Sequence, residues 1–393
     1  MDAPHLMHVW DDYMPGAFIE PHRYMHHLSD WNSEVLAARG LNVEDCRLPR
    51  VNYLRVENRD QDGPNDLWRR VKGKIRRTLR ENQYDKFCRQ QLEQKSPDLV
   101  HLHFGTTAAR LYPVFEAAKR KVVSFYGVDA SAAFFDPKMV KRYQRMFKGY
   151  DIFIVLSEIV KERLVAHGCP AEKIRVWNIP AGIEIYPYRE RQRIEGQTRF
   201  IMCARFVGKK GYPYLLEAFR KYLDQGHHGT LTVIGYGQDK GAIIDQAERL
   251  ELGDRFNLID SEAKPTFKQI YNEQLSESDV FVLPSTTGKD GDDEGGPALT
   301  MICAQASGLP VVCTPFVGAE ISMEDGKTGF YCEVDNADDL SQKMIAISKQ
   351  RDRWETMGKL GSDLVYSEFS LDSQMEKLQD IYREVLGLPV GHA

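Results

Sequence analysis

The stretch RFIMCARFVGKKGYPYLLEAF, residues 199–219, contains the unit from which the predicted fold is built. Its first part, RFIMCA, is apolar enough to be a parallel strand buried between helices. The last part belongs to YPYLLEAFRKYL (212–223), which has a helical pattern. Between them lies a loop of cations and glycines: Arg205, Gly208, Lys209, Lys210 and Gly211. The stretch therefore predicts a strand–loop–helix unit of an α/β protein.

Similar short apolar runs recur along most of the chain, with helical patterns between them. Candidates for buried strands lie at 5–10, 99–104, 121–126 and 151–156, and again at 199–204, 230–235, 279–284 and 310–314. Strands that alternate with helices form parallel sheets with right-handed crossovers. The chain is therefore predicted to be an α/β protein throughout.

The length of 393 residues favours two domains over one. The best boundary is a polar, charged segment with Pro and Gly at about 180–198. We expect a first domain at 1–182, a linker at 183–198 and a second domain at 199–368. Residues 369–393 contain an amphipathic helix, which is expected to cross back to the first domain.

Composition limits the possible functions. Hydrophobic residues make up 42% and charged residues 28%, as in an ordinary globular protein, and the net charge of −5 argues against nucleic acid as a general partner. Seven scattered cysteines without a C-x-x-C pair predict neither a disulfide framework nor a zinc site. Neither a signal peptide nor an apolar stretch of membrane-spanning length is evident. We therefore expect a cytoplasmic protein, or one bound to the inner face of the cell membrane.

The loop after strand 199–204 has the chemistry of an anion site. Ligands of open α/β sheets bind at the carboxyl ends of the strands, where this loop lies. Arg205 can hold an anionic oxygen with two donors, and Lys210 adds a second charge. Each charge-assisted hydrogen bond would contribute roughly 1.5–3 kcal/mol. The alternative interpretation is a solvated loop whose cations contact nothing.

A second stretch, DEGGPALTMICAQASGLPVV (293–312), predicts a turn, a helix and a buried strand. Gly295 and Gly296 leave backbone N–H groups accessible, and Pro297 suits the first helical position. The start of this helix, which includes Ala298 and Leu299, would direct N–H donors at a diphosphate. Glu294 would accept hydrogen bonds from sugar hydroxyls nearby, or it would only cap the helix.

Another glycine pair, Gly235 and Gly237, follows strand 230–235 and is weak evidence for a ligand loop on its own. The sequence contains neither a G-x-G-x-x-G motif nor a G-K-[ST] loop, so a dehydrogenase or P-loop protein has no support.

Taken in order, these segments resemble the retaining family-4 glycosyltransferases with the GT-B fold. The likeness covers about residues 97–387. CARFVGKKGYPYLLEAF (203–219) is similar to the family's donor-phosphate segment, VIGYG (233–237) to its G-x-G turn, and DVFVLPS (279–285), DEGGP (293–297) and AQASGLPVV (304–312) to its glutamate block. VGAEISMEDGKTGFYC (317–332), VHLHFG (100–105), FYGVD (125–129) and IVLSE (154–158) also fit.

The resemblance implies two Rossmann-like domains with parallel sheets facing across a cleft. It implies transfer of a sugar from a UDP- or GDP-sugar to a glycan, lipid-linked or protein acceptor, with no metal and no cofactor beyond the donor. The catalytic residues would be Arg205, Lys210 and Glu294. The donor would contact Gly16, Tyr126, Gly235, Gly237, Gly295, Gly296, Pro297, Ala298, Leu299, Cys303 and Glu320. The acceptor would contact His103 and Asp129.

Three departures from the family pattern qualify this reading. The family has a second glutamate, which holds the ribose hydroxyls. Counting forward from Glu294 places Ile302 at its position, and counting back from SGLP (307–310) places Cys303 there. Tyr126 stands where the family commonly has histidine. Gly16 is the only glycine in the N-terminal loop, where the family has a pair. These departures motivate a rival hypothesis, a catalytically degenerate GT-B subunit that binds or chaperones an active transferase.

The segment 67–81, LWRRVKGKIRRTLRE, combines seven cations with an apolar stripe. A basic amphipathic helix of this kind predicts peripheral contact with a membrane, and a solvated surface helix is the alternative. Three histidines at 22, 26 and 27 suggest a metal site, but their irregular spacing favours a surface or acceptor loop instead.

Overall fold

The structure is a computed structural model, and it describes residues 3–13, 25, 27–40, 52–58, 83–190, 195–261, 267–289 and 291–391. The chain divides into two compact units. The first comprises Met1–Trp177 with Met375–Ala393, and the second comprises Asn178–Gln374. The segment 183–198, expected to be a linker, is thus counted with the second unit, and the division lies a few residues earlier.

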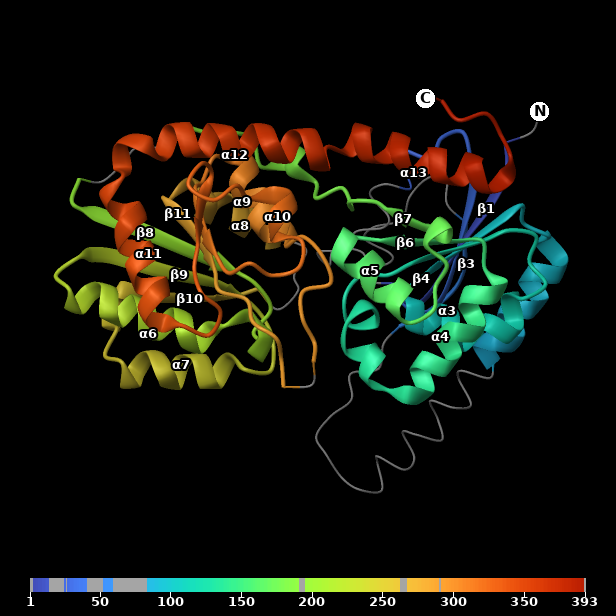
Figure 1. Ribbon diagram of the computed structural model, residues 1–393, viewed down its shortest axis with the longest axis horizontal. Coiled ribbons are helices and arrows are strands. Elements are labelled where there is room, and N and C mark those ends of the chain that lie inside the picture. The colour runs from blue at the N-terminus through green and yellow to red at the C-terminus, as the bar shows by residue number, and fades with distance from the viewer. Residues whose placement is uncertain are drawn as a thin grey trace, which may run out of the picture. The chain divides into compact units, whose positions relative to one another are not determined.

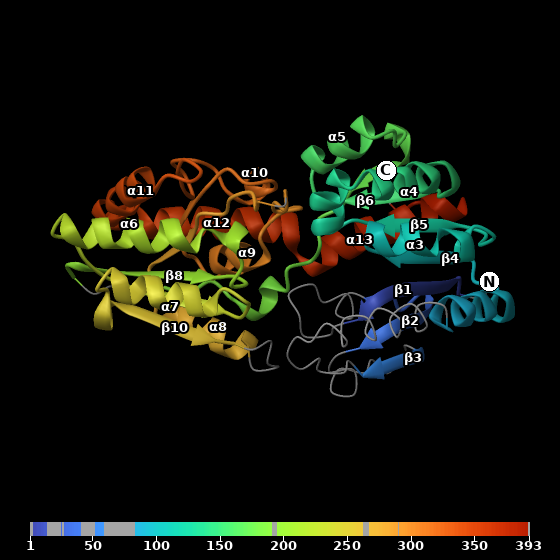
Figure 2. The ribbon, with the colours of Figure 1, turned by 90° about the horizontal axis from the view of Figure 1, so that it is seen from below.

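The first unit is built on a seven-stranded parallel sheet in the order β3-β2-β1-β4-β5-β6-β7. Its strands are β1 (His5–Tyr13), β2 (Asn32–Gly40), β3 (Asn52–Asn58), β4 (Leu99–His103), β5 (Lys121–Ser124), β6 (Ile152–Val155) and β7 (Ile174–Val176). Its helices are residues 83–95, α3 (Gly105–Phe115), α4 (Pro137–Gly149) and α5 (Glu158–Ala166), with 3-10 turns η2 (Val128–Ala130), η3 (Ala132–Phe135) and η4 (Ala171–Lys173). In Figure 2, β1, β2 and β3 lie side by side at one end of this sheet.

The second unit has a six-stranded parallel sheet in the order β10-β9-β8-β11-β12-β13. Its strands are β8 (Gln197–Cys203), β9 (His228–Gly235), β10 (Phe256–Asp260), β11 (Val280–Leu283), β12 (Val311–Cys313) and β13 (Gly329–Tyr331). Its helices are α6 (Tyr212–Asp224), α7 (Lys240–Arg249), α8 (Phe267–Ser276), α9 (Leu299–Ala306), α10 (Ala319–Ser322), α11 (Ala337–Lys349) and α12 (Trp354–Phe369). The 3-10 turns are η5 (Ile183–Ile185), η6 (Gly208–Lys210), η7 (Gly253–Arg255) and η8 (Arg351–Arg353). Helices α6, α7 and α11 are labelled in Figure 1.

The burial of the central strands accounts for their apolar sequences. Every residue of β4, β5, β6, β11 and β12 is buried. Strands that are covered by helices on both faces need apolar side chains at successive positions, not at alternate ones. Runs of successive apolar residues were the basis for the strands predicted at 99–104, 121–126, 151–156, 279–284 and 310–314. Each of these ranges contains an observed strand.

The last helix, α13 (Leu371–Leu386), links the two units in sequence, because the division falls between Gln374 and Met375. Its later residues bond within the first unit. The hydroxyl of Tyr382 lies 2.6 Å from Nδ1 of His101, and the Trp31 indole N–H donates to Gln379. Arg175 forms an ion pair with Glu384. None of the helices formed by the described residues is long and apolar enough to cross a bilayer.

Candidate active site

Three loops meet at the carboxyl edge of the second sheet, and hydrogen bonds hold them together. The backbone N–H of Thr286, after β11, donates to the carbonyl of Lys209, after β8, at 2.7 Å. The Thr314 hydroxyl, after β12, donates to the carbonyl of Ser285 at 2.5 Å. The loops that carry the predicted residues are therefore fixed to one another.

Gly211 allows this close approach. It has φ +71°, and a Cβ atom there would lie 1.8 Å from the carbonyl oxygen of Pro284. Any other residue would suffer both the left-handed backbone and the overlap. The glycine after the two lysines is thus required by the contact between the loops that follow β8 and β11.

Lys210 and Glu294 form an ion pair at this edge. Lys210 Nζ lies 2.5 Å from Glu294 Oε1, and the side chains are only 12% and 10% exposed. The Ser285 hydroxyl donates to the same carboxylate oxygen at 2.8 Å. The two residues predicted from separate motifs, 84 positions apart, are therefore in direct contact.

The pKa values of Lys210 and Glu294 are shifted by burial and by neighbouring charges. Burial raises the pKa of Glu294, but the charges of Lys210 and Lys209, with hydrogen bonds from Lys210 and Ser285, outweigh it and leave that pKa below its usual value. Burial lowers the pKa of Lys210; Glu294 opposes this shift, while the charges of Lys209 and Arg205 add to it. An anionic ligand beside Lys210 would relieve this repulsion among cations.

The other cations of the loop have different surroundings. Lys209 is buried, and its ammonium group donates to the carboxylate of Asp292 at 2.9 Å and to the carbonyl of Asp293 at 2.7 Å, which ties β8 to the loop before Glu294. Arg205 is exposed, and its side chain has no ion-pair partner among the residues that the structure describes. Of the predicted catalytic residues, Arg205 is the one whose charge is not already neutralised by a neighbour.

The helix after Glu294 begins later than expected. Pro297 was predicted to be its first residue, but α9 begins at Leu299, and Ala298 is an extended N-cap without a side-chain cap. The prediction was wrong by two residues, a common error at helix ends. A neighbouring loop packs against this turn: a Cβ atom on Gly318, which has φ +90°, would lie 2.3 Å from the nitrogen of Pro297.

The start of α10 therefore lies beside the start of α9. Glu320 is exposed, and its carboxylate accepts a hydrogen bond from the N–H of Gly318 at 2.9 Å. Gly295 and Gly296 are buried in the turn between Glu294 and α9.

The glycines after β9 pack against the loop after β8. A Cβ atom at Gly235 would lie 2.0 Å from the carbonyl of Ala204, and one at Gly237 would lie 2.4 Å from that of Phe206. The space that a side chain would occupy at these positions is filled by backbone. That close packing is a structural reason for both glycines, beside the predicted contact with the donor.

The two positions where the family has its second glutamate are both buried. Ile302 is fully buried, in a cluster with Ile183, Ala306, Val365 and Phe369. Cys303 is 5% exposed, and its thiol lies 3.5 Å from the carbonyl of Ala181. Ile302 therefore contributes to the packing of α9 against α12.

Three predicted residues in the first unit have internal partners. The buried Asp129 carboxylate accepts hydrogen bonds from the N–H groups of Gly105, Tyr126 and Gly127 at 2.7–3.3 Å, and burial raises its pKa. His103 is fully buried, and its ring stacks on Trp10 with centroids 3.8 Å apart. His103 Nδ1 lies 2.5 Å from the hydroxyl of Tyr126, which is 5% exposed.

Some predictions fall on parts of the chain outside the described residues. These are Gly16, the basic segment 67–81, His22 and His26. Other residues of the site were not singled out from the sequence. Ser285 and Thr314 each follow a buried strand within two residues, and Ser285 is also the last residue of the DVFVLPS segment that resembles the family.

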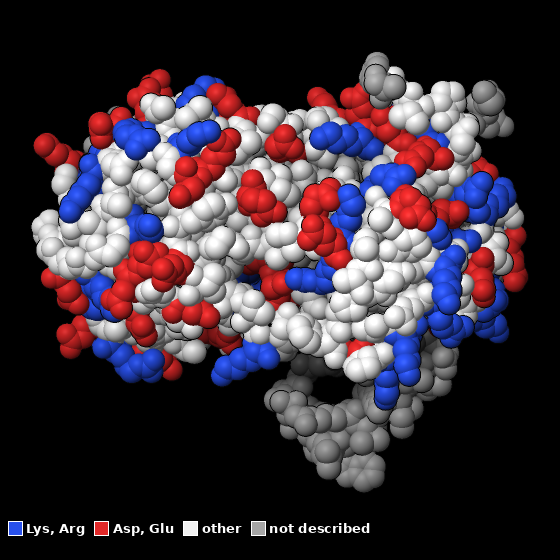
Figure 3. Space-filling view, in the orientation of Figure 1, with Lys and Arg blue, Asp and Glu red and all other residues white. Residues whose placement is uncertain are grey.

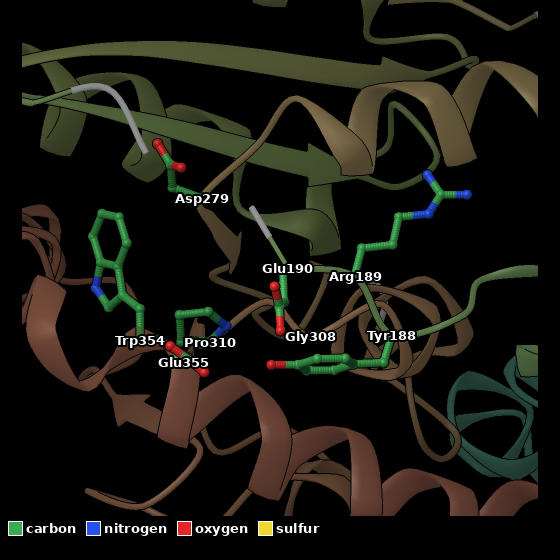
Figure 4. Close-up of a pocket in the computed structure, with 8 residues that line it drawn as sticks. All are labelled: Tyr188, Arg189, Glu190, Asp279, Gly308, Pro310, Trp354 and Glu355. Atoms are coloured by element: carbon green, nitrogen blue, oxygen red, sulfur yellow. The ribbon is translucent and has the colours of Figure 1, made fainter. Parts of the chain in front are cut away.

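A cavity of about 340 Å³ lies elsewhere in the second unit. Figure 4 shows the residues that line it, Tyr188, Arg189, Glu190, Asp279, Gly308, Pro310, Trp354 and Glu355. Asp279 and Pro310 directly precede β11 and β12, so this cavity is at the amino edge of the sheet, opposite the Lys210–Glu294 pair. It contains none of the predicted site residues.

Comparison with protein families agrees with this architecture. Residues 33–184 match the model of Glycosyltransferase Family 4, and residues 187–362 match that of Glycosyl transferases group 1. The amylovoran biosynthesis glycosyltransferase AmsK of Erwinia amylovora is 31% identical over 259 residues, which is 64% of this chain and 61% of that protein. The putative colanic acid biosynthesis glycosyltransferase WcaL of Salmonella typhimurium is 28% identical over 304 residues, 76% of this chain and 73% of that protein. The match to AmsK thus spans less than two thirds of its length.

Solved structures share the fold over nearly the whole chain. A glycosyltransferase from Rickettsia africae has a TM-score of 0.74 at 17% identity, covering 98% of this chain and 99% of its own. Anabaena HepE in complex with UDP has a TM-score of 0.71 at 14% identity, covering 96% and 99%. With its two parallel-sheet units, the chain belongs to the family-4 glycosyltransferases with the GT-B fold.

Proposed function

We propose that this protein transfers a sugar from a UDP- or GDP-sugar to a glycan, lipid-linked or protein acceptor in polysaccharide biosynthesis. The observation that carries the proposal is the Lys210–Glu294 pair at the carboxyl edge of the second sheet, beside the exposed Arg205 and the start of α9. The names of the relatives from Erwinia and Salmonella support the polysaccharide context.

In the proposed reaction, the donor diphosphate binds Arg205, Lys210 and the N–H groups at the start of α9. An acceptor hydroxyl attacks the anomeric carbon on the face from which the diphosphate departs, and its proton passes to a departing phosphate oxygen. The anomeric configuration is then retained. Lys210 and Arg205 stabilise the negative charge that develops on the leaving group, which is an electrostatic task and needs no metal.

Glu294 takes two parts in this proposal. It holds Lys210 in place before the donor arrives, and its second oxygen is available to accept a hydrogen bond from a hydroxyl of the donor sugar. A carboxylate would repel a phosphate placed directly against it, so the sugar and not the diphosphate is expected at Glu294.

The experiment is a thermal-shift panel with UDP, GDP, ADP and their sugars, followed by a transfer assay with the donor that stabilises the protein most. We expect Arg205→Ala and Lys210→Ala to lower turnover at least a hundredfold, whereas Lys359→Ala, which removes an exposed cation of α12, leaves it unchanged. NMR of the product's anomeric proton tests retention, and EDTA tests metal independence.

Unchanged turnover in both loop variants would reject the assignment of these residues. A protein that binds none of the nucleotides would instead be the rival, a non-catalytic GT-B subunit that acts on another transferase. The buried Lys210–Glu294 pair favours the enzyme over the non-catalytic subunit. Burying two charges costs free energy, and a subunit without catalytic function has no use for them.

We also propose that the protein works at the inner face of the cell membrane. In addition to the predicted segment 67–81, helix α4 presents five exposed cations and no acidic residue: Lys138, Lys141, Arg142, Arg145 and Lys148. Among the described residues none of them has an ion-pair partner, and Figure 3 shows blue side chains over this part of the first unit. Phe135, two residues before α4 and next to its N-cap Asp136, is 72% exposed. Cations next to an exposed aromatic ring suit an anionic lipid surface.

Sedimentation with vesicles that contain one third anionic lipid tests the membrane proposal. We expect binding that weakens with added salt and is lost when Lys141, Arg142 and Arg145 become Glu. The same replacement of three exposed cations of the second unit, Lys327, Lys349 and Lys359, is the matched control. Equal binding by both triple variants would contradict a role for α4.

A further inference from the structure

Phe104 has a strained backbone conformation. Its φ of +71° and ψ of 123° place an aromatic residue in a region that bulky L-residues rarely occupy. Within the described part of the chain, the other non-glycine residues with positive φ are Ser96, Glu251 and Asp335, which are all polar. Strain of this kind persists only where the surrounding structure imposes it, and it is concentrated at functional sites.

The surroundings of Phe104 impose this conformation from both sides. The N–H of Phe104 donates to the carbonyl of Ser124, the last residue of β5, at 2.9 Å. Its carbonyl accepts a hydrogen bond from the N–H of Ala108 at 3.0 Å, within α3. The next N–H, that of Gly105, donates to the buried carboxylate of Asp129 at 2.7 Å. Phe104 is therefore held between the end of β5 and the start of α3.

A glycine at position 104 would adopt this conformation without strain. The glycine of the turn is instead the next residue, Gly105, where a Cβ atom would lie 2.1 Å from the buried ring of Phe125. The glycine thus serves the packing of Phe125, and the strained position has an aromatic side chain. A side chain kept in spite of an unfavourable backbone indicates a use for the side chain itself.

The ring of Phe104 is the outermost of a run of packed rings. Trp10 stacks on His103 with centroids 3.8 Å apart, and His103 stacks on Tyr126 at 5.9 Å. Phe104 meets Tyr126 edge to face at 4.9 Å. The first three side chains are at most 5% exposed, whereas Phe104 is partly exposed. An edge-to-face contact covers at most one face of a ring, so Phe104 keeps a face for another partner.

The position of Phe104 in the fold is one where a ligand is expected. It directly follows β4, at the carboxyl edge of the first sheet, and open α/β sheets bind ligands at this edge. His103 and Asp129, which were predicted to contact the acceptor, are both buried and have internal partners. Phe104 lies next to His103 in sequence and is accessible.

The chemistry around the ring suits a sugar. A pyranose ring carries C–H groups on its faces and hydroxyl groups around its rim, and the weakly positive C–H groups are attracted to the negative face of an aromatic ring. Partly exposed Thr106 follows two residues later, in the first turn of α3, where N–H groups have no acceptor within the helix. An aromatic face and hydrogen-bonding groups therefore occur together at this edge.

We infer that Phe104 is a platform on which a sugar ring of the acceptor stacks. The strained turn fixes the direction of the ring, and Asp129 is a positioning residue because it holds the turn through Gly105. The inference rests on the proposed function for the role of this sugar. It goes beyond that function by assigning a pyranose unit to the acceptor and by naming the residue that contacts it.

Stability measurements separate a binding role from a structural one. We expect Phe104→Gly to keep the melting temperature within about 4 °C of the wild-type value, because relief of the backbone strain offsets the lost packing of the ring. Glu251→Gly, at an exposed residue with φ +52°, is the matched control for strain relief. A larger fall for Phe104→Gly would show that the ring serves the fold, and would overturn the inference.

Saturation-transfer NMR with methyl glycosides of glucose, galactose, mannose and fucose measures sugar contact. We expect ring C–H signals of at least one glycoside with the wild-type protein and with Phe104→Trp, which keeps an aromatic face. Phe104→Leu and Phe104→Gly should weaken these signals about threefold to tenfold. Tyr112→Leu, which alters a partly exposed aromatic residue of the same helix, is the matched control and should not.

The possible outcomes distinguish this inference from the proposed function. Equal glycoside signals from the wild type and Phe104→Leu would refute the inference, and transfer activity in both would keep the proposed function. Vesicle binding that Phe104→Leu weakens while the glycoside signals persist would assign the ring to lipid and also refute it. Absence of transfer with every donor would refute the proposed function, and sugar contact at Phe104 would still be read from the spectra.

Discussion

At the scale of single residues, the Lys210–Glu294 ion pair makes stability depend on both side chains being charged. Both groups are buried, so the loss of one charge leaves the other without compensation. The carboxylate has a lowered pKa, and its contribution to stability is therefore present above the usual pKa of a glutamate and is lost as the pH falls through the folded value.

We expect Glu294→Gln and Lys210→Met each to lower the free energy of unfolding by roughly 3 kcal/mol at pH 7. The double variant should lose less than the sum of the two, because no lone charge remains. Urea denaturation of the four proteins measures the coupling. Strictly additive losses would mean that the two side chains do not interact in solution.

Ile302 provides a second test at this scale. It stands at one of the two positions where the family has its second glutamate, but it is fully buried in an apolar cluster. Restoring the family acid with Ile302→Glu would bury an unpaired carboxylate, with an expected loss of about 4 kcal/mol or more.

The control is Ile302→Val, for which the expected loss is about 0.5–1.5 kcal/mol. Thermal unfolding of both variants checks the difference. A stable Ile302→Glu protein with improved nucleotide binding would show that this side chain faces the ligand instead of α12.

At the scale of elements, the site depends on how closely the loops after β8 and β11 approach each other. Gly211 and Gly226 both have positive φ, +71° and +82°, but only Gly211 faces another backbone. At Gly226, no atom of the described residues lies within 4 Å of the position that a Cβ atom would occupy.

Gly211→Ala is therefore expected to displace the loop that carries Lys210, to lower the melting temperature and to weaken nucleotide binding at least tenfold. Gly226→Ala carries only the backbone penalty, about 1–2 kcal/mol, and should bind nucleotide normally. Calorimetry and nucleotide titration compare the two. Equal binding by both variants would show that the contact with Pro284 does not position the site.

At the scale of the whole molecule, the two units should respond differently to acid. The pKa values of His8, His101 and His103 are lowered by burial, so the unfolded chain binds more protons than the folded one below about pH 6.5. Stability of the first unit should fall as the pH drops from there, by about 1.4 kcal/mol per pH unit for each histidine.

Urea denaturation at pH 7.5, 6.5 and 5.5, followed by tryptophan fluorescence, measures this slope. Trp10, which stacks on His103, and Trp177 report on the first unit, and Trp354 reports on the second. His8→Phe should reduce the slope, and His228→Asn, at an exposed site, should not. Equal acid sensitivity of both units would contradict the prediction.

The α/β class, most of the central strands and helix α6 could be predicted from the sequence. This was possible because a strand buried on both faces must be apolar at successive positions, and because the apolar residues of α6 recur at helical spacing. Strands β2, β3, β7, β10 and β13 were missed. Four of them are edge strands and β2 is next to one, and they carry more polar residues or are very short.

Which residues are in contact could be seen only in the folded protein. Lys210 and Glu294 are 84 positions apart, and no local pattern shows that they form one ion pair. The same holds for His8 and His103, which are 95 positions apart in sequence and are neighbours only because β1 and β4 pair in the sheet. Periodicity reports the environment of a side chain, whereas the identity of its partners depends on strand order and register, which are set by packing over the whole domain.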